Sequence, residues 1–211
     1  MLGFILSKIN LLILVISVFA IVTFFLFGLS DIVKVEEMKL LLNRAVKLSD
    51  SLVAAPTLCE SAYHYLPNYI RLLGDDFYYV MRVSRQQLEL ENGEYVNYLI
   101  FSVMSRKDYQ QAVKEGKEPN SIAANSFRTS ADVRIWSKVD DEWGVVDSAI
   151  IDPQAALPDT RNAFVFVKEI VGGKATLYVI PCNAQICEEA KTSVGEIIHP
   201  DIADLEGGFH C

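Results

Sequence analysis

The sequence has few of the residues on which enzymes rely. It contains only three histidines, His64, His199 and His210, and none lies in a recognisable metal-binding or nucleophile motif. The G-x-S-x-G, H-E-x-x-H and phosphate-loop patterns do not occur. The acidic run Asp140-Asp141-Glu142 stands between two expected strands, where a turn explains it. We therefore expect no enzymatic activity, no cofactor, no metal and no catalytic residue.

Positive charge is also scarce. The chain after Ser30 carries 18 Lys and Arg against 27 Asp and Glu, a net charge of −9. A body this acidic is a poor partner for nucleic acid or anionic lipid headgroups, so we expect no nucleic-acid partner. The sequence has no internal repeat, no low-complexity tract and no N-x-S/T sequon.

Charge of either sign is missing from one long run. Ile9–Ser30 has no charged residue and is bounded by Lys8 and Asp31. About 20 apolar residues suffice for a helix to cross a bilayer. Secretory signals have shorter apolar regions and end at a small-residue cleavage site, so a retained anchor over residues 1–30 is favoured over a cleaved signal. We expect this single span to contact lipid, or other membrane or filament subunits, through Leu11, Leu12, Ile13, Leu14, Val15, Ile16, Val18, Phe19, Ile21, Val22, Phe24 and Phe25.

Residues 31–55 continue the anchor as an amphipathic helix. Apolar residues recur there at spacings of three and four, the period of a helix, at Val35, Met38, Leu41, Leu42, Ala45, Leu48, Leu52 and Val53. No proline occurs before Pro56, so one helix of roughly 45–50 residues is predicted. Its second half offers an apolar stripe to the rest of the chain.

Residues 56–211 are expected to form a β-rich domain. Segments rich in β-branched and aromatic residues, separated by turn signals, predict strands at Phe77–Val83, Tyr95–Met104, Val133–Val139, Trp143–Ile150, Ala163–Ile170 and Lys174–Ile180. A short helix is expected at Asp108–Gly116, a polar loop at Lys117–Phe127, and irregular chain at Leu58–Leu73. The predicted fold class is α+β: a long N-terminal transmembrane and amphipathic helix packed on an antiparallel sheet of about five or six strands, followed by a disulfide-stapled C-terminal segment.

The four cysteines all follow the apolar run. An even number suits disulfides in an extracytoplasmic domain, and four cysteines allow three pairings. The favoured pairing joins Cys182 to Cys187 and Cys59 to Cys211. The alternative is a zinc site formed by Cys182 and Cys187 with His199 and either His210 or Cys211. Asp201, Asp204 and Glu206 could form a calcium loop, but a solvated acidic tail is favoured because three carboxylates supply too few oxygens.

Six aromatic residues lie close together in the sequence: Tyr63, Tyr65, Tyr69, Phe77, Tyr78 and Tyr79. They could stack on a sugar or peptide. Packing in the core or at the membrane interface is favoured, because alternation along a strand turns half of its side chains inward.

The orientation rests on two opposing arguments. Lys34, Lys39, Arg44 and Lys47 follow the apolar run and only Lys8 precedes it, so the positive-inside rule alone would leave the body in the cytoplasm. Long domains translocate largely regardless of charge, however, and the cysteines suit an oxidising compartment. We therefore expect a single-pass protein of the cell membrane with its C-terminal domain outside the cytoplasm.

This order of elements resembles type IV pilin-like proteins, and archaeal pilin-like surface proteins in particular. In those families an apolar N-terminal helix is first a membrane anchor and later the core of a filament, while its second half carries a β-rich head. Gly3-Phe4 stands where a prepilin leader would end, and Lys8 occupies the position at which pilins often have Glu. The resemblance implies a structural or accessory subunit of a surface filament or its assembly machinery. The alternative is a membrane-tethered ectodomain that binds a ligand or a partner protein.

Overall fold

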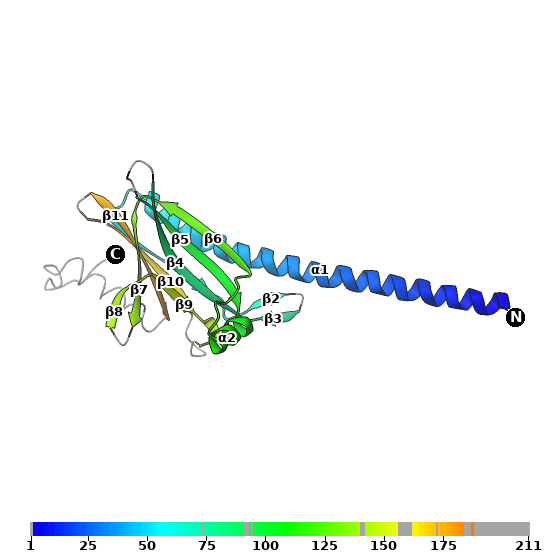
Figure 1. Cartoon of the computed structure of the whole chain (residues 1–211). Coiled ribbons are helices and arrows are strands. Elements are labelled where there is room, and N and C mark those ends of the chain that lie inside the picture. Colours follow the sequence, from blue (N-terminus) through cyan, green and yellow to red (C-terminus); the bar gives the residue numbers. More distant parts are fainter. Residues whose placement is uncertain are drawn as a thin grey trace.

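A computed structural model describes residues 2–72, 74–90, 93, 95–139, 142–155, 162–171, 173–183 and 187. One helix, α1 (Leu2–Ala54), extends far out of a β-rich head (Figure 1). The head lies around the C-terminal half of α1, and the N-terminal half makes no part of it. The protein is thus a long rod with a globular head at one end.

The described residues of the head form eleven strands and two short helices. In chain order these are β1 (Cys59–Leu66), β2 (Ile70–Leu72), β3 (Asp75–Phe77), β4 (Tyr79–Glu89), β5 (Tyr95–Ser105), α2 (Arg106–Glu115), β6 (Ala123–Thr129), β7 (Asp132–Val139), β8 (Glu142–Val146), β9 (Ser148–Ile151), the 3-10 helix η1 (Pro153–Ala155), β10 (Asn162–Val171) and β11 (Lys174–Asn183). Gly116 ends α2 in the left-handed conformation (φ 64°), which glycine adopts without strain.

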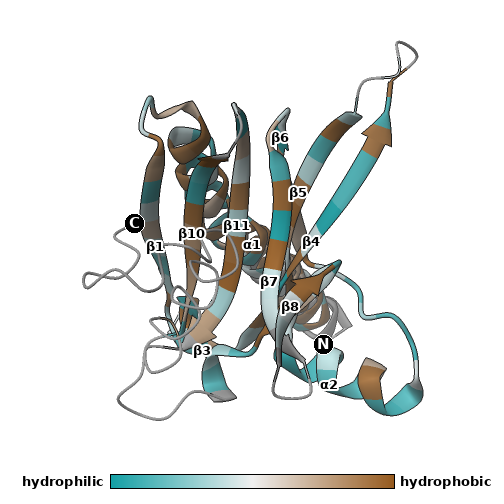
Figure 2. Ribbon diagram, turned by 90° about the vertical axis from the view of Figure 1, so that its left-hand side faces the viewer, coloured by the Kyte–Doolittle hydropathy of each residue, from teal (hydrophilic) through white to brown (hydrophobic). Residues whose placement is uncertain are grey.

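The strands form two main sheets. One has the order β1-β10-β11-β7-β8, as Figure 2 shows, and the other has the order β6-β5-β4-β9. A separate hairpin pairs β2 with β3. All described pairs are antiparallel except β11 with β7, which run parallel.

The helix closes one side of the space between the two sheets. Its C-terminal half packs against β6 and β1, the outer strands of the two sheets, and reaches β5, β10 and β11 behind them. On the other side β4 and β9 approach β7 and β11 directly. There Arg85 of β4 donates a hydrogen bond to the carbonyl of Val133 on β7 (3.4 Å). The head is therefore a sandwich closed along one edge by a helix.

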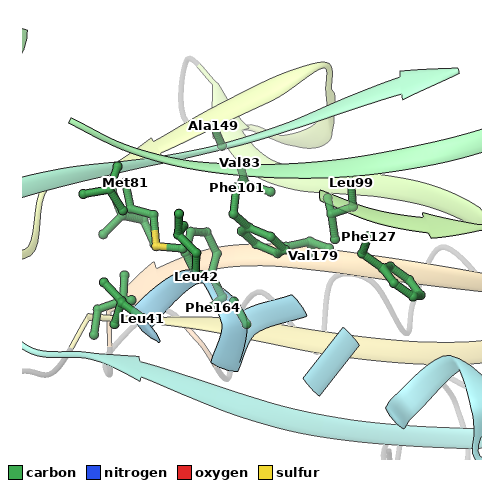
Figure 3. Packing of buried hydrophobic residues seen from close by; sticks show 14 of the residues in the cluster. Leu41, Leu42, Met81, Val83, Leu99, Phe101, Phe127, Ala149, Phe164 and Val179 are labelled. Carbon is green, nitrogen blue, oxygen red and sulfur yellow. The ribbon is translucent and has the colours of Figure 1, made fainter. Parts of the chain in front are cut away.

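The main core lies in this closed space. Leu41 and Leu42 of α1 are directed toward the layer where Phe101 of β5 and Phe164 of β10 meet (Figure 3). The rings of Phe101 and Phe164 are 5.9 Å apart at a steep angle, the edge-to-face arrangement that aromatic pairs prefer. A second apolar cluster lies on the other face of the five-stranded sheet and includes Trp136 and Tyr178.

The predicted fold class is confirmed: a long N-terminal helix, a β-rich head and a disulfide in the C-terminal region. The helix ends at Ala54, just before Pro56, as expected. The hairpin of β10 and β11 and the helix α2 are also where the sequence placed them.

The structure corrects two segments and the strand count. Leu58–Leu73 was expected to be irregular but contains β1 and β2, and Lys117–Phe127 was expected to be a loop but contains most of β6. The expected strand Trp143–Ile150 is two strands, β8 and β9, which belong to different sheets. The five or six expected strands in one sheet are therefore eleven described strands, divided among three sheets.

The N-terminal helix and the distal hollow as candidate functional sites

The apolar half of α1 is exposed on every side. All twelve residues predicted to contact lipid or other subunits are exposed, from Val15 at 41% to Phe24 at 78%. Soluble monomers rarely expose continuous apolar patches larger than a few hundred Å². By length and composition α1 is the one described helix fit to cross a membrane. Such a surface is typical of a helix that lies in lipid or packs against other proteins.

The dimensions and polar groups of this segment suit a bilayer. At 1.5 Å per residue, Ile9–Ser30 spans about 33 Å, close to the thickness of about 30 Å of the hydrocarbon core. Ser17 Oγ donates a hydrogen bond to the carbonyl oxygen of Ile13, four residues earlier (2.8 Å). The hydroxyl is thus satisfied within the helix, as a nonpolar medium requires.

The head begins where the apolar run ends. Asp31 and Lys34 form an ion pair (3.3 Å), and Lys34 Nζ also lies 5.4 Å from the centre of the Phe77 ring on the β2–β3 hairpin. Val33, between them, is the first residue of α1 that packs against the core. Figure 1 shows the β2–β3 hairpin as the part of the head closest to the N-terminal half of α1. In a membrane, this hairpin would lie next to the bilayer surface.

The amphipathic half of α1 is fixed in the head. Met38, Leu42 and Ala45 are fully buried, and Leu41 and Leu52 nearly so, which agrees with the apolar stripe seen in the sequence. Ser49 is buried on the same stripe, and its hydroxyl donates to the carbonyl of Ala45 (2.9 Å). On the exposed side, Asn125 Nδ2 of β6 donates to Asn43 Oδ1 (2.6 Å). Apolar burial and polar contacts together fix the position of this half of the helix in the head.

Two buried basic side chains line the helix–head junction. His64 of β1 is only 8% exposed, and burial, with the nearby positive charge of Arg44 on α1, lowers its pKa to about 4. The imidazole is therefore neutral near pH 7. Lys168 of β10 is 1% exposed, and its Nζ donates a hydrogen bond to the carbonyl oxygen of Ala55, just beyond the end of α1.

The cysteines follow the favoured pairing where the structure describes them. Cys182 and Cys187 form a disulfide. Their sulfur atoms are therefore unavailable as the thiolate ligands of the alternative zinc site. Cys59 is disulfide-bonded as well, but its expected partner, Cys211, lies outside the described residues.

The remaining candidate metal ligands were His199 and His210 for zinc, and Asp201, Asp204 and Glu206 for calcium. All five lie outside the described residues. Within the described ranges, no group of three or more His, Cys, Asp and Glu side chains has the arrangement of a metal site.

The six clustered aromatic residues do not form one surface. Tyr79 is fully buried with its hydroxyl donating to the carbonyl of Pro67 (2.7 Å), and burial raises its pKa. Phe77 packs against the core. Tyr63 stacks with Tyr65 on β1 (6.0 Å), whereas Tyr69 contacts Tyr78 at the base of the β2–β3 hairpin (6.3 Å). The six residues are thus divided among the core (Phe77 and Tyr79), a stacked pair on β1 (Tyr63 and Tyr65) and the base of the β2–β3 hairpin (Tyr69 and Tyr78).

A polar hollow lies at the end of the head away from the apolar half of α1. The strand registers place three turns there: between β4 and β5, between β6 and β7, and between β10 and β11. The hollow among these turns has a volume of about 900 Å³. We call it the distal hollow; it is lined by Gln87, Tyr95, Asn97, Ser130, Ala131, Asp132, Arg134, Gly173, Lys174, Ala175 and Thr176.

No local pattern in the sequence indicates the distal hollow. Its lining residues come from four strands, β4, β5, β7 and β11, and from the β6–β7 and β10–β11 turns, and they form no motif in the sequence. Only the pairing of distant strands, including the parallel pair of β11 with β7, brings them together.

Comparison of the chain with protein-family models, curated proteins and solved structures finds no match.

Proposed function

We propose that this protein is a pilin-like structural or accessory subunit of a cell-surface filament or of the machinery that assembles one. The observation that carries the proposal is the division of α1 into two halves. The first is exposed and apolar, and the second buries one face in a head. A subunit that is first held in a membrane and then joined to other subunits through its helix needs an exposed apolar half for both steps and a second half that holds the head.

The proposed mechanism is an exchange of one apolar environment for another. In the membrane, lipid surrounds side chains such as Phe19 and Phe24; in a filament, neighbouring copies of α1 surround them. Because both surroundings are apolar, the hydrophobic effect itself changes little, and side-chain packing between helices drives association. The buried half of α1 keeps each head at a fixed place along the helix.

We further propose that the head lies outside the cytoplasm. The Cys182–Cys187 disulfide and the oxidised state of Cys59 support this, because disulfides persist mainly in oxidising compartments. A membrane-impermeant thiol reagent on intact cells tests it. We expect labelling only after reduction. Thiols that react only after cell lysis would place the head in the cytoplasm and contradict the proposal.

Site-specific photocrosslinking tests assembly. A photoreactive amino acid replaces Phe19, which is 69% exposed on the apolar half of α1, in cells that express the full chain. We expect a ladder of covalent multimers and filaments visible by electron microscopy. The matched control places the same group at Leu88, an exposed apolar residue of β4 at the far end of the head, where we expect few adducts. Monomers alone at Phe19, together with bare cell surfaces, would contradict a filament role.

A second candidate function is a tethered binding module. The distal hollow favours it, since such a module needs a concave site that faces away from the membrane. Monomeric behaviour in the crosslinking experiment would select this function over assembly.

A further inference from the structure

The distal hollow has a preformed floor. Asn97 Nδ2 of β5 donates to the carbonyl of Ala131 in the β6–β7 turn (2.8 Å), and the Ala131 amide donates to Thr129 Oγ1 (3.0 Å). Arg134 Nε binds Asp132 Oδ2 (2.8 Å). The Arg134 guanidinium also lies 5.9 Å from the centre of the Tyr178 ring. These contacts hold the floor in place without a ligand, which lowers the cost of ordering the site when a ligand binds.

The rim of the distal hollow carries exposed polar side chains that are available to bind a ligand. Tyr95 is 54% exposed, and Gln87 and Lys174 are exposed too. In the part of the chain that the structure describes, the side chains of Gln87, Tyr95 and Thr176 form no hydrogen bond. The amide and the two hydroxyls supply both donors and acceptors. The site is therefore equipped to bind a ligand that has many hydrogen-bonding groups of both kinds.

The charges of the hollow limit the class of ligand. Asp132 and Arg134 form an ion pair, which leaves Lys174 as the one other charged side chain among the described lining residues. A multiply charged anion would therefore find one free cation among these described residues, on a chain of net charge −8. An apolar ligand would find two alanines and a single aromatic ring among mainly polar groups. Neither class fits as well as a neutral polar ligand.

We propose that the distal hollow is a binding site for a neutral saccharide. Exposed Tyr95 would supply a ring for the apolar C–H face of a sugar, and Gln87, Thr176 and the Asp132–Arg134 pair, which line the same hollow, would supply partners for its hydroxyls. The volume of about 900 Å³ lies within the range of about 300–1,000 Å³ that is usual for small-molecule sites. The proposal does not depend on filament formation, because the hollow lies within a single copy of the chain.

The test uses the full chain in phosphatidylcholine nanodiscs, because detergents with sugar headgroups would compete. The probes are glucose, galactose, mannose, N-acetylglucosamine and their di- and trisaccharides, followed by saturation-transfer NMR. We expect at least one neutral saccharide to bind. Tyr95→Ala should weaken that binding about tenfold, the loss of one aromatic contact, and Tyr95→Phe should retain most of it. Tyr78→Ala is the matched control, since Tyr78 is 40% exposed near the other end of the head, and binding should not change.

Three outcomes would overturn the proposal. The first is that no neutral saccharide binds. The second is that binding is the same in Tyr95→Ala and Gln87→Ala as in the unaltered chain. The third is that only acidic saccharides bind, with the loss in Lys174→Ala and not in Tyr95→Ala, which would mark a simple charge contact. Because circular dichroism of each variant reports its folding, and the crosslinking ladder reports assembly, loss of saccharide binding is distinguishable from failure of the proposed assembly role.

Discussion

Lys168 donates a hydrogen bond from its Nζ to the main-chain carbonyl of Ala55, and this contact joins the middle of a sheet to the end of α1. The last carbonyls of a helix have no partner within the helix, and a cation there also complements the helix dipole. The last turn of α1 has no basic residue of its own. A strand that follows more than a hundred residues later in the sequence therefore caps the helix.

Lys168→Met tests this cap. Methionine keeps much of the length and apolar stem of lysine but cannot donate, so the carbonyl of Ala55 loses its partner. We expect the free energy of unfolding to fall by about 1–3 kcal/mol. Urea denaturation of the full chain in phosphocholine micelles, followed by the fluorescence of Trp136 and Trp143, measures it. The control Lys47→Met, at an exposed position of α1, should change stability by less than about 0.5 kcal/mol. Equal effects of the two variants would contradict the capping role.

His64 makes the stability of the head depend on pH. Its pKa is about 4 in the folded protein and about 6.5 in an unfolded chain, so between these values the unfolded chain binds the proton more tightly. Stability should therefore be at its full value above about pH 6.5 and should fall as the pH falls toward 4, by about 3 kcal/mol in all. His64→Leu has no proton to bind, and we expect its denaturation midpoint to change less over this window. Parallel slopes for the two proteins would show that other groups cause the pH dependence.

Leu42 and Leu40 form a matched pair on the same helix. Leu42 is fully buried between the sheets, whereas Leu40 is 53% exposed. Leu42→Ala removes buried apolar atoms and leaves a cavity, so we expect a loss of about 2–5 kcal/mol. Leu40→Ala should cost less than about 0.5 kcal/mol. Both variants are measured by urea denaturation. Similar losses of unfolding free energy at the two positions would contradict the packing of the Leu42 side of α1 against the head.

The Cys182–Cys187 disulfide closes a short loop. A loop with a sequence separation of 5 loses little entropy when closed, so we expect Cys182→Ala/Cys187→Ala to cost only about 2 kcal/mol. The variant should lose further stability when reductant is added, because Cys59 is also disulfide-bonded. Non-reducing peptide mapping confirms which bonds are present. A variant that no longer responds to reductant would contradict a second disulfide at Cys59.

The sequence predicted best those elements that local chemistry specifies. The end of α1 follows from Pro56, which cannot continue a helix, and the β10–β11 hairpin follows from two apolar runs around Gly172-Gly173. The buried stripe of α1 follows from its period. Each of these signals lies within a few residues of the feature that it predicts.

The sequence did not reveal strands with few apolar residues. The side chains of β1 that face the core include Ala62 and His64, one small and one polar, so the usual alternation is hidden. In β6 only Phe127 is a large buried apolar residue, and Asn125 is used in a polar contact with α1. The distal hollow was missed for another reason: it depends on pairings between distant strands, which no local pattern encodes.

Because α1 is one uninterrupted helix, the rotation of its N-terminal half about the helix axis fixes the rotation of the head. Each residue of an α-helix turns the chain by about 100° and advances it by about 1.5 Å. Since Met38, Leu42 and Leu52 are buried in the head, the direction in which the head faces around the helix axis is set by the direction in which Phe19 or Phe24 faces. One alanine inserted near Ser30 would leave every contact within the head intact and yet turn the whole head by about 100° around the helix axis.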